Sequence, residues 1–121
     1  ILPISHLQAH EPSIWNIDNS VFFCEGKNVI VISEHTEKKF NPFNFKFSLD
    51  TERKAVTYKS DDFNFMASSV VYAATRTGEV SIVAEDSLSV TDRMTLSGRN
   101  FSYYTTGDKS SWLITAVCDR F

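Results

Sequence analysis

Short β-type segments separated by polar turns follow one another from residue 50 to residue 118, and they constrain the fold of this chain more than any other feature. Apolar and polar residues alternate within these segments, as they do in strands that bury one face of a sheet. The segments recur at the spacing of about 8–12 residues that is typical of β-sandwiches and β-barrels. The sequence therefore predicts an all-β fold, a single antiparallel β-barrel or sandwich of about eight strands.

The clearest alternation lies just before this region. Phe43, Phe45, Phe47 and Leu49 share one face of an extended segment, and residues 54–59 return as its hairpin partner. Further strands are expected at residues 63–66, 70–75, 79–84, 88–96, 99–105 and 111–118. Residues 19–121 are thus predicted to form the β-domain.

Another hairpin is predicted around Gly26, because glycine accepts the positive φ angle of a tight turn. Val21–Glu25 and Asn28–Ser33 would be its strands, since both are rich in residues that favour strands. Residues 29–32 are apolar in succession, so this strand is expected to be covered on both faces. An irregular N-terminal arm, residues 1–18, is the expected cover. Residues 34–42 are charged and end in a turn signal.

The chain has two cysteines, Cys24 and Cys118, which bracket most of the predicted strands. This placement favours a disulfide and therefore an oxidising compartment, periplasmic or secreted. A bridge closing so long a loop would contribute about 4–5 kcal/mol in the chain-entropy model. The alternative is two reduced, buried thiols. Because the chain begins at Ile1 without a signal-peptide pattern, we expect a mature form or a trimmed piece.

Several classes of function lack support in the sequence. The net charge of −3 argues against nucleic acid and anionic membranes as partners. No apolar run approaches the roughly 20 residues that span a bilayer. No nucleophile elbow and no phosphate-binding glycine loop is present, so no catalytic residue and no cofactor are predicted. His6 and His10 are four residues apart, but we expect surface histidines and no metal site.

Asp92 falls on the apolar side of the strand predicted at residues 88–96. In a regular strand it would point into the core, where a carboxylate needs a partner. Arg99 or Arg76 would supply that partner, or Asp92 would line a ligand cavity. The alternative is a β-bulge that turns Asp92 outward.

The features that are candidates for function lie in the last third of the chain. The residues predicted to take part in binding are Asp92, Arg93, Ser97, Arg99, Tyr103, Tyr104 and Lys109. Asn100 begins an N-glycosylation sequon, which is informative only in a eukaryotic source. The aromatic residues either fill the barrel or line a cavity, so the expected partner is a protein or a small apolar ligand. The oligomeric state is left open.

Two parts of the chain resemble the small periplasmic inhibitors of c-type lysozyme. The segment FFCEGK at residues 22–27 resembles that family's first strand and cysteine. The segments SGRNF and YYTTGD, at residues 97–101 and 103–108, resemble its Ser-Gly-x-x-Tyr segment and its later Lys-Gly-Asp. The resemblance implies a small antiparallel barrel in which Ser97 enters the lysozyme cleft. Phe101 replaces the family's Tyr, and Thr106 stands in place of its Lys, with Lys109 nearby.

The segment VTDRMT at residues 90–95 is also similar to uncharacterised exported bacterial β-proteins, which implies no function. Together these observations predict a non-catalytic exported β-domain that binds a protein or a small apolar ligand. A periplasmic inhibitor of c-type lysozyme is the alternative, and a small hydrolase-like enzyme is the second alternative.

Overall fold

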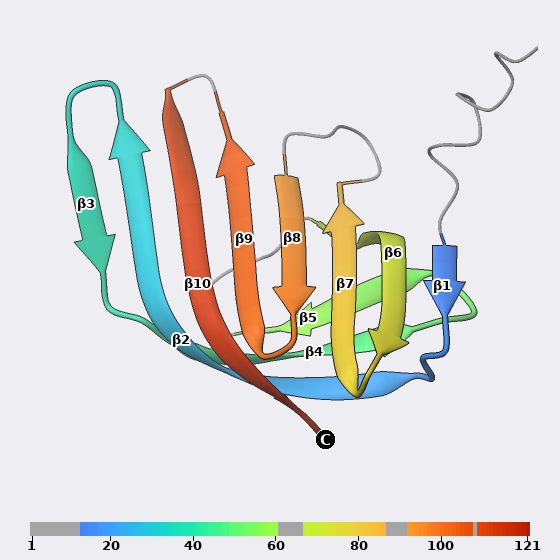
Figure 1. Cartoon of the computed structure of the whole chain (residues 1–121). Helices are drawn as coiled ribbons and strands as arrows, with labels where there is room; N and C mark the ends of the chain where they lie inside the picture. The colour runs from blue at the N-terminus through green and yellow to red at the C-terminus, as the bar shows by residue number, and fades with distance from the viewer. Residues whose placement is uncertain (1–12, 61–66, 87–91, 108) are drawn as a thin grey trace, which may run out of the picture.

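The computed structural model describes residues 13–60, 67–86, 92–107 and 109–121, and these residues contain ten strands and no helix (Figure 1). The strands are β1 (Ser13–Trp15), β2 (Ser20–Ser33), β3 (Glu37–Phe40), β4 (Asn44–Asp50), β5 (Ala55–Lys59), β6 (Ser69–Arg76), β7 (Glu79–Glu85), β8 (Asp92–Ser97), β9 (Asn100–Thr106) and β10 (Ser110–Arg120). The predicted all-β fold is confirmed. In the described parts of the chain, no helix is long and apolar enough to cross a membrane.

Eight of the strands close a barrel. They follow the order β6-β5-β4-β2-β10-β9-β8-β7, and β7 pairs with β6 again. Every pair in this ring is antiparallel. Because the ring is closed by the pairing of β7 with β6, the barrel, and not the sandwich, is the correct alternative. β1 pairs with β6 in parallel and β3 pairs with β2, both outside the ring. Residues 13–15 of the predicted irregular arm are therefore a short strand; residues 1–12 lie outside the described residues.

The hairpin predicted around Gly26 is wrong, because β2 runs unbroken through this glycine. Gly26 lies opposite Ala116 and Asn28 lies opposite Thr115, which leaves one extra residue in β2 as a bulge. The Gly26 N–H donates a hydrogen bond to the Phe43 carbonyl oxygen at 3.1 Å. A Cβ atom at position 26 would lie 2.3 Å from that oxygen. Glycine is needed here for a close approach of two backbones and not for a turn.

The bulge divides β2 into two parts with different neighbours. Residues 20–25 pair with β4 inside the ring, whereas residues 29–32 pair with β3. β10 follows β2 along both parts. β2, β3, β10 and the end of β9 therefore continue beyond the strands β4 and β5 that cross beneath them (Figure 1). We call residues 28–33, 37–40, 104–106 and 110–115 the sheet extension. The segment expected as a charged turn, residues 34–42, thus contains β3.

Aromatic side chains pack against one another inside the barrel. Phe22 stacks on Phe47 with ring centroids 4.7 Å apart, and Phe45 meets Phe101 edge to face at 4.9 Å. These four rings and Tyr103 are all buried. The interior described here is therefore occupied by side chains, the outcome expected for a barrel of eight strands.

The predicted disulfide between Cys24 and Cys118 is present. The two residues lie directly opposite each other on β2 and β10, with both side chains in the buried core. Since 94 residues separate them in the sequence, the bridge joins the first barrel strand to the last. The disulfide thus crosslinks the two ring strands that are farthest apart in the sequence.

Candidate binding surfaces

Asp92 points into the barrel and is only 6% exposed, so the alternative of an outward-turning bulge is wrong. Its carboxylate accepts hydrogen bonds from the hydroxyl groups of Tyr103, at 2.9 Å, and Thr105. Arg76 and Arg99 flank the turns at the opposite end of β8, so neither supplies the expected partner. Two neighbouring hydroxyl groups on β9 stabilise this buried carboxylate instead.

Arg93 follows Asp92 on β8 and points to the outside of the barrel. Its guanidinium group donates a hydrogen bond to Glu85, directly opposite on β7, at 2.8 Å. Arg93 is therefore half of a partly exposed cross-strand ion pair, a contact that contributes little to stability in water.

The two tyrosines in the predicted binding set lie on opposite faces of β9. Tyr103 is part of the buried core, while Tyr104 points outward and is 42% exposed. The alternation along a strand makes this difference obligatory, since neighbouring side chains leave opposite faces. Only Tyr104 is accessible to a macromolecular partner.

Ser97 and Lys109 are both exposed, but they lie at opposite ends of β9. Ser97 ends β8 before the turn into β9, and Lys109 lies in the turn that leads into β10. Seven strand residues between them correspond to roughly 23 Å. Arg99 binds Asp119 at 2.8 Å beside the first of these turns. The seven residues predicted from the sequence therefore do not form one site.

An aromatic stack on the inner face of the sheet extension was not predicted. Phe40 of β3 and Trp112 of β10 lie with ring centroids 5.8 Å apart and an interplanar angle of 12°. They reach across β2, where Val29 and Val31 lie opposite Phe40 and Trp112 respectively. Phe40 remains 47% exposed. The stack forms an accessible aromatic surface beyond the closed part of the barrel.

The outer face of the sheet extension is also apolar. Ile30 of β2, Leu113 of β10 and Tyr104 of β9 are directly opposite one another in a row across three strands. Ile32, next along β2 on the same face, is 50% exposed. Of the N-terminal arm that was expected as a cover, residues 13–15 pair with β6 instead, and residues 1–12 lie outside the described residues. Apolar side chains thus reach solvent on both faces of the extension.

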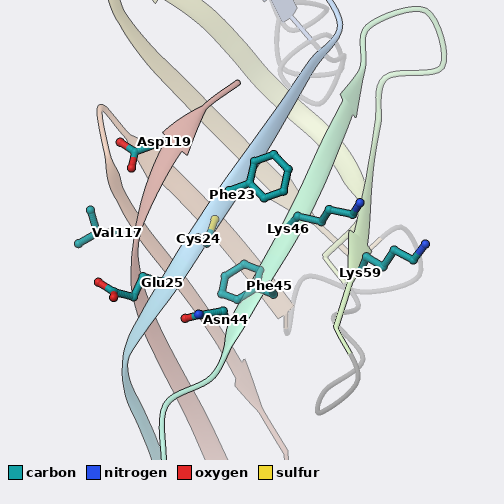
Figure 2. A pocket seen from close by; sticks show the side chains of 9 residues that line it. All are labelled: Phe23, Cys24, Glu25, Asn44, Phe45, Lys46, Lys59, Val117 and Asp119. Carbon is teal, nitrogen blue, oxygen red and sulfur yellow. The ribbon is translucent and has the colours of Figure 1, made fainter.

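A groove of about 580 Å³ crosses the outside of β2, β4 and β10 within the ring (Figure 2). Its lining residues are Phe23, Cys24, Glu25, Asn44, Phe45, Lys46, Lys59, Val117 and Asp119. Lys46 and Lys59 form one side of the groove, and Glu25 and Asp119 form the other, as Figure 2 shows. A hydrogen bond and the positive charge of Lys27, 2.5 Å away, lower the pKa of the Glu25 carboxyl. Strand alternation predicts which of these residues face outward, but it does not predict that they meet.

Tyr58 lies near the buried Asp92–Tyr103 pair. Its hydroxyl group donates a hydrogen bond to the Ala67 carbonyl oxygen at 2.6 Å. Burial, and to a smaller extent the neighbouring Tyr103, raises the pKa of this hydroxyl well above its usual value near 10. Tyr58 is therefore a neutral hydrogen-bond donor throughout the physiological pH range.

The described residues bring no set of three His, Cys, Asp or Glu side chains close enough to hold a metal ion. Both cysteines are in the disulfide, so neither is a thiol nucleophile. Comparison of the chain with protein-family models, with curated proteins and with solved structures found no match.

Proposed function

We propose that this chain is a non-catalytic, exported domain that binds a protein partner through the sheet extension. The observation that carries the proposal is the exposure of apolar side chains on both faces of one small sheet, Ile32 and Tyr104 outside and Phe40 inside. Exposed apolar groups that cluster on one part of a surface are typical of protein interfaces, where aromatic residues are enriched. The extension also presents β3, whose far edge has no strand partner among the described residues.

The barrel interior favours a protein over a small apolar ligand. A carrier of such ligands needs an apolar cavity, whereas Phe22, Phe47 and Phe101 occupy the described interior. The extension is an open surface and not an enclosed site. Such a surface suits a partner that brings its own apolar face.

Export is supported by the disulfide. Structural disulfides form and persist in oxidising compartments and are rare in the cytosol of most organisms. A chain of this size gains much of its stability from a bridge of long span. The export part of the proposal is tested by alkylating free thiols in intact source cells, where the native chain should contain none.

Photo-crosslinking tests the proposed interface. A benzoylphenylalanine group is placed at position 40, on the extension, and in a matched variant at position 52, which is exposed in the turn between β4 and β5. In the source cells we expect a discrete protein adduct from position 40 and none from position 52. The same adduct should be lost when Ile32→Asp is added. Adducts of equal yield from both positions, or none from either, would contradict the proposal.

The lysozyme-inhibitor hypothesis remains a second proposal because Ser97 is exposed beside a tight turn, with Gly98 at a φ angle of 64°. Inhibition of a c-type lysozyme by the intact chain, and its loss in Ser97→Ala, would support this hypothesis. Since Lys109 lies at the other end of β9, Lys109→Ala should then leave inhibition unchanged. Full lysozyme activity at a large excess of the chain would contradict the lysozyme-inhibitor hypothesis.

A further inference from the structure

We propose that the groove across β2, β4 and β10 is a second binding site, which takes an extended peptide segment bearing acidic side chains next to an apolar one. The groove lies in the closed ring, apart from the sheet extension. Its volume of about 580 Å³ lies within the roughly 300–1,000 Å³ of ligand sites. The inference is therefore independent of the partner proposed for the extension.

Two lysines on neighbouring strands give the groove a basic side. Lys46 of β4 lies directly opposite Lys59 of β5, and both side chains leave the outer face of the sheet (Figure 2). Like charges in directly opposite positions destabilise a sheet. No ion pair with an acidic residue of the described segments is formed by either lysine. An anion placed between them would remove their repulsion.

The acidic side of the groove differs, because its carboxylates already have cationic neighbours. Glu25 pairs with Lys27 at 2.5 Å, and Asp119 pairs with Arg99 at 2.8 Å. The acidic side is thus compensated by neighbouring cations, whereas the described residues supply no carboxylate to the basic side. In a chain of net charge −3, this is a local site for negative charge.

Phe23 sets the second requirement on the ligand. Its ring is 43% exposed within the groove, and the Lys46 ammonium group lies 5.9 Å from the ring centroid. A ligand that reaches both lysines therefore passes an aromatic surface. An acidic residue followed by an apolar one meets this pattern, and Asn44 offers an amide that can both donate to and accept from a peptide backbone.

The same geometry disfavours a continuous polyanion. A nucleic acid carries a charge on every phosphate, and its backbone would be repelled by Glu25 and Asp119 across the groove. A peptide places its charges on separate side chains, so one part can be acidic while the part beside the acidic wall is neutral or basic. The occupant we infer is thus a protein segment.

The test uses two blocked peptides, Ac-Glu-Phe-Glu-NH2 and Ac-Lys-Phe-Lys-NH2, titrated into the full isotope-labelled chain and followed by amide NMR shifts. We expect the acidic peptide to shift the amide signals of residues 44–46 and 59, and the basic peptide to leave these signals unchanged. Lys46→Gln/Lys59→Gln should weaken binding about tenfold, the effect of losing two exposed charge contacts. The matched control, Lys38→Gln/Lys39→Gln on β3, should bind as the native chain does.

Three results would overturn the inference. The first is equal weakening in the control variant, which would indicate only a general effect of net charge. The second is an unchanged affinity in Phe23→Ser, which would remove the apolar contact from the site. The third is the same set of shifts with sulfate alone at equal affinity, which would indicate a small-anion site. The groove variants Lys46→Gln/Lys59→Gln and Phe23→Ser leave the sheet extension unaltered, whereas only the control, Lys38→Gln/Lys39→Gln, lies in it. Failure of the groove variants therefore leaves the proposed function to its own test.

Discussion

The two parts of β2 have similar compositions but different surroundings. In residues 20–25, Phe22 and Cys24 are buried in the ring while their neighbours face solvent. In residues 28–33, Val29 alone is buried, and apolar side chains reach solvent on both faces. The difference comes from the neighbouring strand, because β4 leads on to β5 and closes the ring, whereas β3 ends the sheet. Most of the stability should therefore come from the ring, and the protein partner proposed above should bind the sheet extension.

The largest effect on stability is expected from the disulfide in the ring. Replacing both cysteines by alanine, in Cys24→Ala/Cys118→Ala, should lower the free energy of unfolding by about 4–5 kcal/mol, since the bridge closes a loop of 94 residues. Urea unfolding monitored by tryptophan fluorescence measures it. The reduced native chain is the control and should show the same loss. A change below about 1 kcal/mol would mean that the bridge does not hold the ring.

The aromatic core of the ring should come next. Phe47→Ala removes a ring that is 1% exposed and stacked on Phe22, so we expect a loss of about 3–5 kcal/mol. The same urea titration gives the value. The cavity left behind cannot collapse easily, because Phe101 and Tyr58 also contact this ring. A loss of less than 1 kcal/mol would place the stabilising core elsewhere.

The bulge itself should rank third. In Gly26→Ala the new methyl group would meet the Phe43 carbonyl oxygen, a backbone atom that cannot turn aside. We expect a loss of about 2 kcal/mol, the usual cost of overpacking. Amide hydrogen exchange should also speed up at the Gly26 N–H, which bonds to that oxygen. If native stability were kept, the bulge would have moved and β2 would have a new register.

The sequence predicted the ring better than the sheet extension. The reason is the sequence separation of the residues whose contacts determine each part. The hairpin of β4 and β5 and the strands predicted at residues 70–75 and 79–84 follow from alternation and turn chemistry within about 20 residues. Gly26 was misinterpreted because its backbone contact is with Phe43, which no local pattern reveals. Phe40 and Trp112 are far apart in the chain, so only the pairing of β2 with both β3 and β10 brings them together.

The candidate sites show the same limit. The period-2 pattern left two orientations open for Asp92, inward in a regular strand or outward at a bulge, and the structure has the inward one. The arginines expected as its partners lie elsewhere. The hydroxyl groups that bind it belong to β9, where Tyr103 and Thr105 share its face. The groove was not predicted, because Lys46 and Asp119 are distant in the sequence and their strands are brought together only through β2.

A pH-dependent effect of intermediate size is expected at Tyr58, inside the ring. Tyr58→Phe leaves the Ala67 carbonyl oxygen without this donor, so we expect a loss of about 1 kcal/mol at pH 7. The pKa of Tyr58 is raised in the fold, so above pH about 10 the unfolded chain loses this proton while the folded chain keeps it. The free energy of unfolding should therefore fall with rising pH, by up to about 1.4 kcal/mol per pH unit from this group.

Urea titrations between pH 8 and 11 check the sign. The native chain should lose stability above pH 10, and Tyr58→Phe should show a shallower decline. Tyr104→Phe is the matched control, because Tyr104 is exposed on the outer face. Parallel declines in the native chain and in Tyr58→Phe would contradict the assignment of this loss to Tyr58.

The smallest effect on stability is expected in the sheet extension. Phe40→Ala removes a ring that is already 47% exposed and whose main ring contact is the stack on Trp112. We expect a loss below about 1 kcal/mol, against the several kcal/mol of Phe47→Ala, although both are phenylalanines on neighbours of β2. Once a partner has been identified by crosslinking from position 40, Phe40→Ala should also weaken the binding of that partner. If Phe40→Ala destabilised the chain as much as Phe47→Ala, the extension would be part of the folding core. Its exposed aromatic surface would then have a structural purpose and not a binding one.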